Sequence, residues 1–198
     1  MITACLVSWK RPEAINTILN NLLKYKCITE IIIWNNNPKL KFNSEAGKIR
    51  AINSEQNKIV YGRYLAAKEA KNDIIYTQDD DWFPGDIDKL ISLHQEKQVT
   101  SFVPQTHIEE KNTNRFVGWG SLFEVSATNV FKDYIKTHGE DYLLYREADL
   151  LFTNVNKYER HLHSSKNLVQ EDSRSLHRQP NHYAYHDEMI ERVRGLYT

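Results

Sequence analysis

At residues 76–82 the chain reads Tyr-Thr-Gln-Asp-Asp-Asp-Trp, so three consecutive carboxylates, Asp79–Asp81, follow a strand-like run. Residues 73–76 before them are largely apolar, and residues 82–86 after them are typical of a turn into a helix. Adjacent carboxylates repel one another unless water or a cation neutralises them. At the carboxyl end of a buried strand, Mg²⁺ or Mn²⁺ suits such oxygens and leaves ligand positions open for phosphate. A solvated acidic turn is the alternative for a bare triplet.

Outward from this stretch, apolar strands and amphipathic helices alternate. We expect a buried strand at Ile2–Val7, a helix beginning at Pro12 and a second buried strand at Glu30–Trp34. Short links between a strand, a helix and a strand indicate a βαβ unit and therefore a mostly parallel sheet. The further elements expected in this half are a short helix near 46–52, a strand at 58–60, a helix at 63–71, a strand at 73–76, a helix at 86–96 and a strand at 99–103.

Beyond Pro104 the pattern is less regular. It predicts strands at 115–120 and 122–125, a helix at 130–136 stopped by Gly139, a helix at 145–155 and a final helix at 187–196. There is no repeat, low-complexity tract or clear linker, which favours one α/β domain.

The composition is that of an ordinary globular protein. Of 198 residues, 40% are hydrophobic and 26% are charged, and 26 basic side chains balance 26 acidic ones. This balance gives no indication of a nucleic-acid or membrane surface as partner. Cys5 and Cys27 lie in apolar stretches without metal-ligand spacing, which favours reduced core residues. With no signal-peptide pattern and no apolar run of membrane-spanning length, we expect a cytoplasmic protein.

Polar side chains follow several of the expected strands. Ser8 and Arg11 come after the first strand, Asn35 and Asn36 after the second, and Gln78 precedes the acidic triplet. In open α/β sheets, ligands bind beyond the carboxyl ends of strands, so these groups are candidates for a nucleotide site. Asparagines also form turns, and surface arginines are commonly only solvated, so each group alone leaves both interpretations open.

The ordered set of motifs resembles a known family. Residues 8–12 (Ser-Trp-Lys-Arg-Pro), residues 30–38 (Glu-Ile-Ile-Ile-Trp-Asn-Asn-Asn-Pro) and Arg63-Tyr64 upstream of Asp79–Asp81 are similar to GT-A glycosyltransferases. The closest resemblance is to the carboxy-terminal domains of exostosin-type (family 64) enzymes, with family-two transferases more distant. It covers most of residues 2–155.

The resemblance implies a single-domain GT-A fold, a nucleotide-diphosphate-sugar donor such as a UDP-sugar, and Mn²⁺ or Mg²⁺ bound at a DXD-type motif. It places Asp81 on the metal, Asp79 nearer the ribose, and Asp80 in support. Ser8, Arg11, Asn35, Asn36, Arg63 and Gln78 are then expected around the nucleotide. It further divides the chain into a nucleotide-sugar-binding half (1–104), an acceptor and catalytic half (105–156) and a lid or tail (157–198).

Two further sites follow from the resemblance. Asp149, with Glu147 second, aligns with an acidic residue that opens a helix facing the anomeric carbon, as a general base in an inverting enzyme or as a charge stabiliser in a retaining one. Acids in a first helical turn can instead merely complement the helix dipole. His182 is expected to contact phosphate or metal, whereas His186 stands where relatives tend to carry arginine, so the phosphate clamp departs from the family pattern.

The implied activity is transfer of a hexosyl or N-acetylhexosaminyl group to a hydroxyl. The acceptor is a saccharide or glycoconjugate, or a hydroxylated nucleic-acid base. A nucleotidyltransferase and a non-catalytic nucleotide-sugar-binding module are the alternatives. The absence of a glycine-rich loop after the first strand ranks the nucleotidyltransferase below the glycosyltransferase.

Overall fold

A computed structural model describes residues 1–43, 45–105, 108, 116–162, 168 and 176–196 of the chain. The first half comprises β1 (Ile2–Ser8), α1 (Pro12–Leu22), β2 (Ile28–Asn35), β3 (Glu45–Ala46), β4 (Ile49–Asn53), the 3₁₀ turn η1 (Ile59–Tyr61), α2 (Gly62–Lys68), β5 (Ile74–Gln78), α3 (Ile87–Leu93) and β6 (Val99–Val103). The second half comprises β7 (Ser121–Glu124), η2 (Val125–Asn129), α5 (Val130–His138), α6 (Tyr142–Val155), β8 (Tyr158–Leu162), η3 (Leu176–Arg178) and α7 (His182–Leu196).

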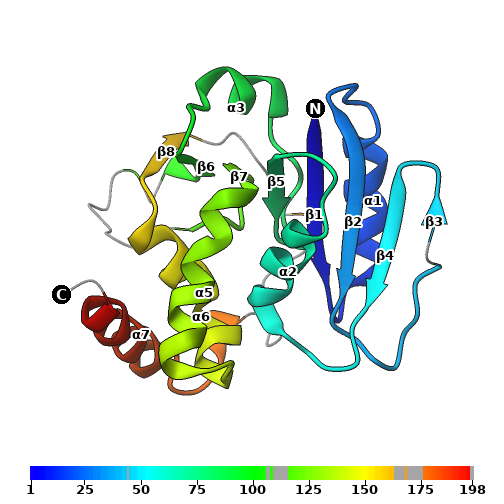
Figure 1. Ribbon diagram of the computed structural model, residues 1–198. Coiled ribbons are helices and arrows are strands. Elements are labelled where there is room, and N and C mark those ends of the chain that lie inside the picture. The colour runs from blue at the N-terminus through cyan, green and yellow to red at the C-terminus, as the bar shows by residue number, and fades with distance from the viewer. Residues whose placement is uncertain (44, 106–107, 109–115, 163–167, 169–175, 197–198) are drawn as a thin grey trace.

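The strands of the described chain form one sheet in the order β3-β4-β2-β1-β5-β7-β6-β8 (Figure 1). The central pairs β4–β2, β2–β1 and β1–β5 are parallel, and β7 is antiparallel to both of its neighbours. Helix α1 lies on one face of the sheet, and α2 and the α5–α6–α7 group lie on the other (Figure 1). The predicted α/β class with a mixed, mostly parallel sheet is therefore confirmed.

Alternation along the central strands builds a core on each face. Ala4 and Leu6 of β1 pack with Ile31 and Ile33 of β2 in the cluster that includes α1 and α3. Cys5 and Ile32, the intervening residues, pack in the second cluster with α2, α5 and α6. Because successive side chains of a strand point to opposite faces, a strand buried on both faces must be apolar throughout. This requirement explains the continuous apolar runs in the sequence.

The predicted helix near 46–52 is wrong. Those residues form the β3–β4 hairpin, which turns at Gly47 with a φ of +61°, and β4 then pairs parallel to β2. Ile49 and Ile52 are three residues apart, a spacing that also fits a helix. In the structure Ile49 packs with the α1-side cluster and Ile52 with the other, as two faces of a strand require.

The predicted strand at 58–60 is also wrong, because asparagine side chains form hydrogen bonds with the backbone N–H and C=O groups of this segment. Asn36 Oδ1 accepts from the N–H of Lys58 at 2.9 Å, and Asn57 Oδ1 accepts from the N–H of Ile59 at 2.8 Å. The carbonyl of Ile59 accepts from Asn36 Nδ2 at 2.8 Å. Side chains that occupy backbone donors in this way prevent a strand ladder, and the segment forms η1.

Three boundaries in the second half differ from the expectation. Residues 116–120 form a turn rather than a strand, whereas Arg115 lies outside the described residues. Helix α6 begins at Tyr142, so Glu147 does not open it but lies at a kink inside it, with φ −111° and ψ 20°. Helix α7 begins at His182, five residues before the expected start. Strand β8 was not predicted, because most of its side chains are polar and give no alternation of apolar and polar residues. In the described part of the chain it pairs with β6 at the edge of the sheet.

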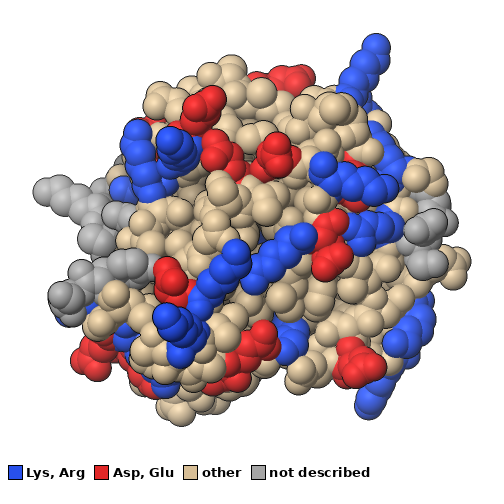
Figure 2. Space-filling model, viewed as in Figure 1, with Lys and Arg blue, Asp and Glu red and all other residues tan. Residues whose placement is uncertain are grey.

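Charge is mixed on the face of the molecule that Figure 2 shows. Figure 2 shows basic and acidic side chains interspersed on the face that carries α2, α5 and α6. No helix in the described part of the chain combines the length and the apolar character needed to cross a membrane.

Candidate active site at the carboxyl ends of the central strands

The acidic triplet is positioned by the end of β5. That strand continues to Gln78, whose side chain is buried, accepts from the Tyr76 hydroxyl at 2.7 Å and donates to the carbonyl of Trp82 at 2.8 Å. The N–H of Asp79 donates to the carbonyl of Gly118 at 2.8 Å. These bonds fix the residues before and after the triplet, and the side chain of Gln78 joins the two ends of the turn.

Arg11, in the connection between β1 and α1, forms ion pairs with the acidic triplet. Its guanidinium lies 2.9 Å from Asp80 Oδ1 and 3.3 Å from Asp81 Oδ2, and the arginine is 7% exposed. β1 and β5 are neighbours in the sheet, so residues beyond their carboxyl ends meet at one edge. Arg11 therefore lies against the acidic triplet, and its expected contact with a nucleotide stays a prediction.

Arg63 joins the two acidic motifs. It is a fully buried side chain of α2 that pairs with Asp79, and its Nε lies 3.5 Å from Asp149 Oδ1. The hydroxyl of Tyr64 donates to the same Asp149 oxygen at 2.8 Å. The acid of α6 and the acids after β5, far apart in the chain, thus share one arginine.

Burial and mutual repulsion shift two of these carboxyls. The pKa of Asp81 is raised to about 7, first by burial and then by the charges of Asp79 and Asp80, with Arg11 acting in the opposite direction. The pKa of Asp149 is raised to about 6, chiefly by burial, while Arg63 lowers it. Both carboxyls therefore change protonation near neutral pH, as groups at functional sites often do.

The asparagines after β2 hold the loops of the site. Asn35 Nδ2 donates to the carbonyl of Leu40 at 2.5 Å and to Asn53 Oδ1 at 2.9 Å, and Asn36 Oδ1 accepts from Trp34 Nε1 at 3.1 Å. Both asparagines are buried, so their amides are engaged in shaping the strand ends. Their contact with a nucleotide stays a prediction.

Ser8 lies beside them at the end of β1. Its hydroxyl is buried and has no hydrogen bond within the described residues, while its carbonyl accepts from the N–H of Asn36 at 2.7 Å. The backbone of Ser8 thus joins β1 to the asparagine turn, and its contact with a nucleotide is likewise a prediction.

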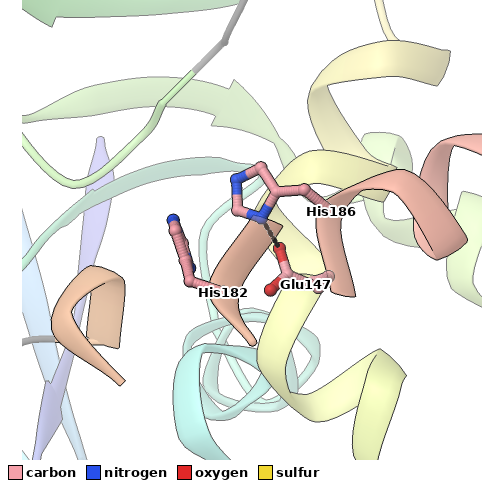
Figure 3. Close-up of side chains that lie close together, drawn as sticks. All are labelled: Glu147, His182 and His186. Carbon is pink, nitrogen blue, oxygen red and sulfur yellow. Dashed lines mark ion pairs between the residues drawn. The ribbon is translucent and has the colours of Figure 1, made fainter. Parts of the chain in front are cut away.

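His182 lies with Glu147 and His186, and its contact with the phosphate or metal of the donor site stays a prediction. The ligand atoms of these three side chains lie within 4.8 Å of one another, the one such group of at least three among the described residues (Figure 3). His107, a further polar candidate that follows the strand expected at 99–103, lies outside the described residues.

Sequence reasoning missed the contributions of Tyr64 and Gly118. In the sequence Tyr64 is only the neighbour of Arg63, yet it is fully buried and its hydroxyl donates to Asp149. A Cβ at Gly118 would lie 2.1 Å from Asp79 Oδ2, so only glycine allows this approach. Gly118 and Gly120 are a turn signal in the sequence, but nothing local to them indicates that Asp79 is the partner.

Comparison with solved structures identifies the fold. The chain matches 4-diphosphocytidyl-2C-methyl-D-erythritol synthase from Anaerococcus prevotii with a TM-score of 0.56 and 12% identity, over 100% of this chain and 96% of that one. It matches glucosyl-3-phosphoglycerate synthase from Mycobacterium tuberculosis, solved with Mn²⁺, UDP and glucosyl-3-phosphoglycerate, with a TM-score of 0.55 and 9% identity, over 99% and 79%.

A third match is Staphylococcus aureus TarS 1-349 in complex with UDP-GlcNAc, with a TM-score of 0.55 and 13% identity, over 96% of this chain and 66% of that one. The chain has the GT-A fold. No protein-family model matches the chain, and no curated protein matches it in sequence. At these identities the likeness extends to the fold alone, and the resemblance to exostosin-type enzymes in particular stays a prediction.

Proposed function

We propose that this protein is a metal-dependent glycosyltransferase that moves a sugar from a nucleotide-diphosphate-sugar to a hydroxyl acceptor. The observation that carries the proposal is the bridge made by Arg63, which brings Asp79 of the acidic triplet and Asp149 of α6 to one place. A donor-binding carboxylate group and a separate carboxylate for the acceptor are the two parts that such a transfer requires. They lie beyond the carboxyl ends of the parallel strands, where ligands bind in α/β sheets.

The acidic triplet fits a divalent cation. Asp81 Oδ1 is buried without a hydrogen bond among the described residues, and burial together with the charges of Asp79 and Asp80 raises the pKa of its carboxyl to about 7. Mg²⁺ or Mn²⁺ prefers such oxygens, and we assign Asp81 and Asp79 to hold it, with Asp80 in support. When bound, the ion neutralises the diphosphate and improves it as a leaving group. Arg11, which pairs with Asp80 and Asp81, is placed to contact the same phosphates.

Asp149 is assigned as the general base. Its side chain is 20% exposed, so one end is accessible, while Oδ1 is held by Tyr64 and lies near Arg63. With a pKa of about 6, the carboxylate is ionised at neutral pH and basic enough to accept a proton from a hydroxyl. Arg63 Nη1 is a buried donor with no hydrogen bond within the described chain, which supports its assignment to the nucleotide side.

The donor proposed is a UDP-sugar carrying a hexosyl or N-acetylhexosaminyl group. Support comes from the fold neighbours solved with UDP and Mn²⁺ and with UDP-GlcNAc. The acceptor is proposed as a saccharide or glycoconjugate hydroxyl, with a hydroxylated nucleic-acid base as the other class. In this scheme residues 1–104 bind the donor, 105–156 supply the acceptor side and the base, and 157–198 cover the site.

A nucleotidyltransferase is the second candidate, because the cytidylyl-transferring synthase from Anaerococcus prevotii matches over the full length of this chain. The two reactions release different products. A glycosyltransferase releases a nucleoside diphosphate, whereas a nucleotidyltransferase releases pyrophosphate. Incubation with UDP-GlcNAc or UDP-glucose and Mn²⁺, or with CTP or UTP, followed by assay for UDP and for pyrophosphate, separates the two.

Calorimetry with UDP tests the donor site. We expect UDP to bind in the presence of Mn²⁺, with affinity reduced at least about tenfold by Asp81→Asn, which removes one charged ligand. Asp133→Asn, an exposed acid of α5, serves as the matched control and should bind like the unchanged protein. The proposal is contradicted if the affinity for UDP is the same with and without Mn²⁺, or if Asp81→Asn leaves that affinity unchanged.

A further inference from the structure

Two helices bring three ligand-type side chains together outside the aspartate site. Glu147 comes from the kink of α6, and His182 and His186 come from the first turns of α7 (Figure 3). The two histidines are four residues apart, a spacing that places them on the same face of a helix. Their ring centroids lie 4.3 Å apart. His186 Nδ1 lies 2.9 Å from Glu147 Oε2.

Close ion pairs hold this group together, but two of its buried atoms lack an aligned hydrogen bond within the described chain. Glu147 is 3% exposed, and its Oε1 lies 3.2 Å from Arg146 Nε. Neither Glu147 Oε1 nor His186 Nδ1 has a hydrogen bond of acceptable alignment among the described residues. Buried polar atoms without such bonds are rare, and each calls for an explanation such as a bound ion.

We propose that Glu147, His182 and His186 form a binding site for a divalent transition metal, with zinc as the favoured ion. Two imidazoles and one carboxylate are a ligand set that zinc uses, with a fourth position left for water. With bonds of about 2.0–2.2 Å, the ligand atoms of a tetrahedral site lie roughly 3.3 Å apart. The ligand atoms of Glu147 and His186 are already near that separation. All three ligand atoms lie within 4.8 Å of one another, so a small side-chain rotation would bring them to the spacing of a tetrahedral site.

Two features oppose a cation here and set the expected strength of the site. Arg146 Nη2 lies 3.2 Å from His182 Nδ1, so metal binding through that nitrogen must displace the contact. The amino end of α7 also carries a partial positive charge. We therefore expect weaker binding than in a closed structural zinc centre with four protein ligands.

Ligand chemistry separates this site from the aspartate triplet. Imidazole nitrogen favours zinc over magnesium, whereas a site made of carboxylates alone favours Mg²⁺ or Mn²⁺. The inference therefore stands independently of the proposed transferase activity. A metal in this position would fix α7 to the kink of α6, next to the segment that carries Asp149.

Metal titration of the whole protein tests the inference. Zn²⁺ binding is measured by competition with a chromogenic chelator, and Co²⁺ is added separately so that its visible absorption reports nitrogen ligation. We expect one Zn²⁺ per chain and a rise in melting temperature. His182→Gln and His186→Gln should each weaken binding at least about tenfold, since even residues that only support a ligand typically contribute that much. His138→Gln, a histidine outside the group, should bind zinc like the unchanged protein.

Two outcomes of the zinc titration would overturn the inference. Absence of Zn²⁺ binding would mean that the three side chains form only a contact between helices. Binding that survives both substitutions, or that is lost in Asp81→Asn, would place the ion elsewhere. Failure of UDP to bind with Mn²⁺ would contradict the proposed function and leave the zinc result unaffected.

Discussion

At the scale of single residues, Arg63 determines how the site is organised. Its guanidinium is buried, so it stays in place only because the carboxylates of Asp79 and Asp149 compensate for the lost hydration. In turn it lowers the pKa of Asp149, which burial alone would raise further. A carboxyl held between these two effects is poised to exchange a proton near neutral pH.

Asp149→Asn should greatly reduce turnover while leaving UDP binding largely intact, because an amide cannot accept the proton. We expect a loss of about 10²–10⁴-fold in kcat, the usual contribution of a general base. In the unchanged protein kcat should rise with pH through about 6, the pKa of Asp149, and then level off. Steady-state rates with a UDP-sugar measure both. Full activity of Asp149→Asn would mean that another group takes the proton.

The same carboxyl affects stability with a definite sign. Its folded pKa of about 6 exceeds the ordinary value near 4, so between these pH values the native state binds more protons than the unfolded state. This group's contribution to the free energy of unfolding therefore falls as the pH rises through that window. We expect Asp149→Asn to gain stability relative to the unchanged protein, by about 2 kcal/mol between pH 4 and pH 7. Denaturant unfolding without metal at both pH values measures the difference, and a constant difference contradicts the assignment.

Gly118→Ala probes the close approach to the triplet. A Cβ there would lie 2.1 Å from Asp79 Oδ2 and 2.7 Å from its Cγ, so the carboxylate must turn away from Arg63. UDP–Mn²⁺ affinity should fall at least about tenfold, or 1.4 kcal/mol, by calorimetry. Gly195→Ala is the control, since nothing lies within 4 Å of its Cβ, and in α7 it should add about 0.5–1 kcal/mol of stability. Unchanged affinity in Gly118→Ala would show that Asp79 is not needed in its present position.

At the scale of elements, α6 carries the catalytic candidate and is fixed at its start. Asp141 caps it by accepting from the N–H of Leu144 at 2.8 Å, and it also pairs with Arg192 of α7 at 2.6 Å. One side chain therefore starts the helix and attaches α7 to it. The kink at Glu147 then redirects the chain before Asp149.

Removing the Asp141 cap should lower the free energy of unfolding. Asp141→Ala is expected to cost about 1–2 kcal/mol in chemical denaturation, the usual range for an N-cap. Asp141→Asn keeps a capping oxygen and loses only the half-exposed ion pair with Arg192, so it should cost less than about 1 kcal/mol. Equal losses in the two variants would show that the ion pair, and not the cap, is responsible.

At the scale of the whole molecule, the two cores fix the relation between the strand ends, and the balance of charge bears on which acceptor to expect. The 26 basic and 26 acidic side chains balance, and Figure 2 shows them interspersed on the face in view. Binding to duplex DNA through its phosphates requires several basic groups gathered on one surface. A neutral saccharide acceptor has no such requirement.

We therefore expect only weak binding to unmodified duplex DNA. Fluorescence anisotropy with a labelled duplex at physiological salt should give a dissociation constant no tighter than about 10⁻⁴–10⁻⁶ M, the range of non-specific contacts. Tighter binding with a steep salt dependence would favour a nucleic-acid base over a saccharide as the acceptor.

Much of the fold could be predicted from the sequence because the spacing of apolar residues along the chain shows which face of each helix or strand is buried. The continuous apolar run at 31–33 indicates a strand covered on both faces, and the helical spacing of Ile15, Ile18 and Leu22 indicates one buried stripe, as found. Two of the errors lie where packing is weak. Strand β8 and the β3–β4 hairpin lie at the sheet edges, where polar side chains hide the strand pattern.

By itself the sequence determined the alternating strands and helices, the acidic turn after β5 and the polar strand ends, since each depends on residues close together in the chain. Only the tertiary structure decided that Arg63 joins Asp79 to Asp149, that Tyr64 holds that acid, and that His182 lies beside Glu147. These contacts connect segments far apart in the chain. Their geometry follows from how two cores pack on the opposite faces of one twisted sheet, and no local pattern of residues encodes that packing.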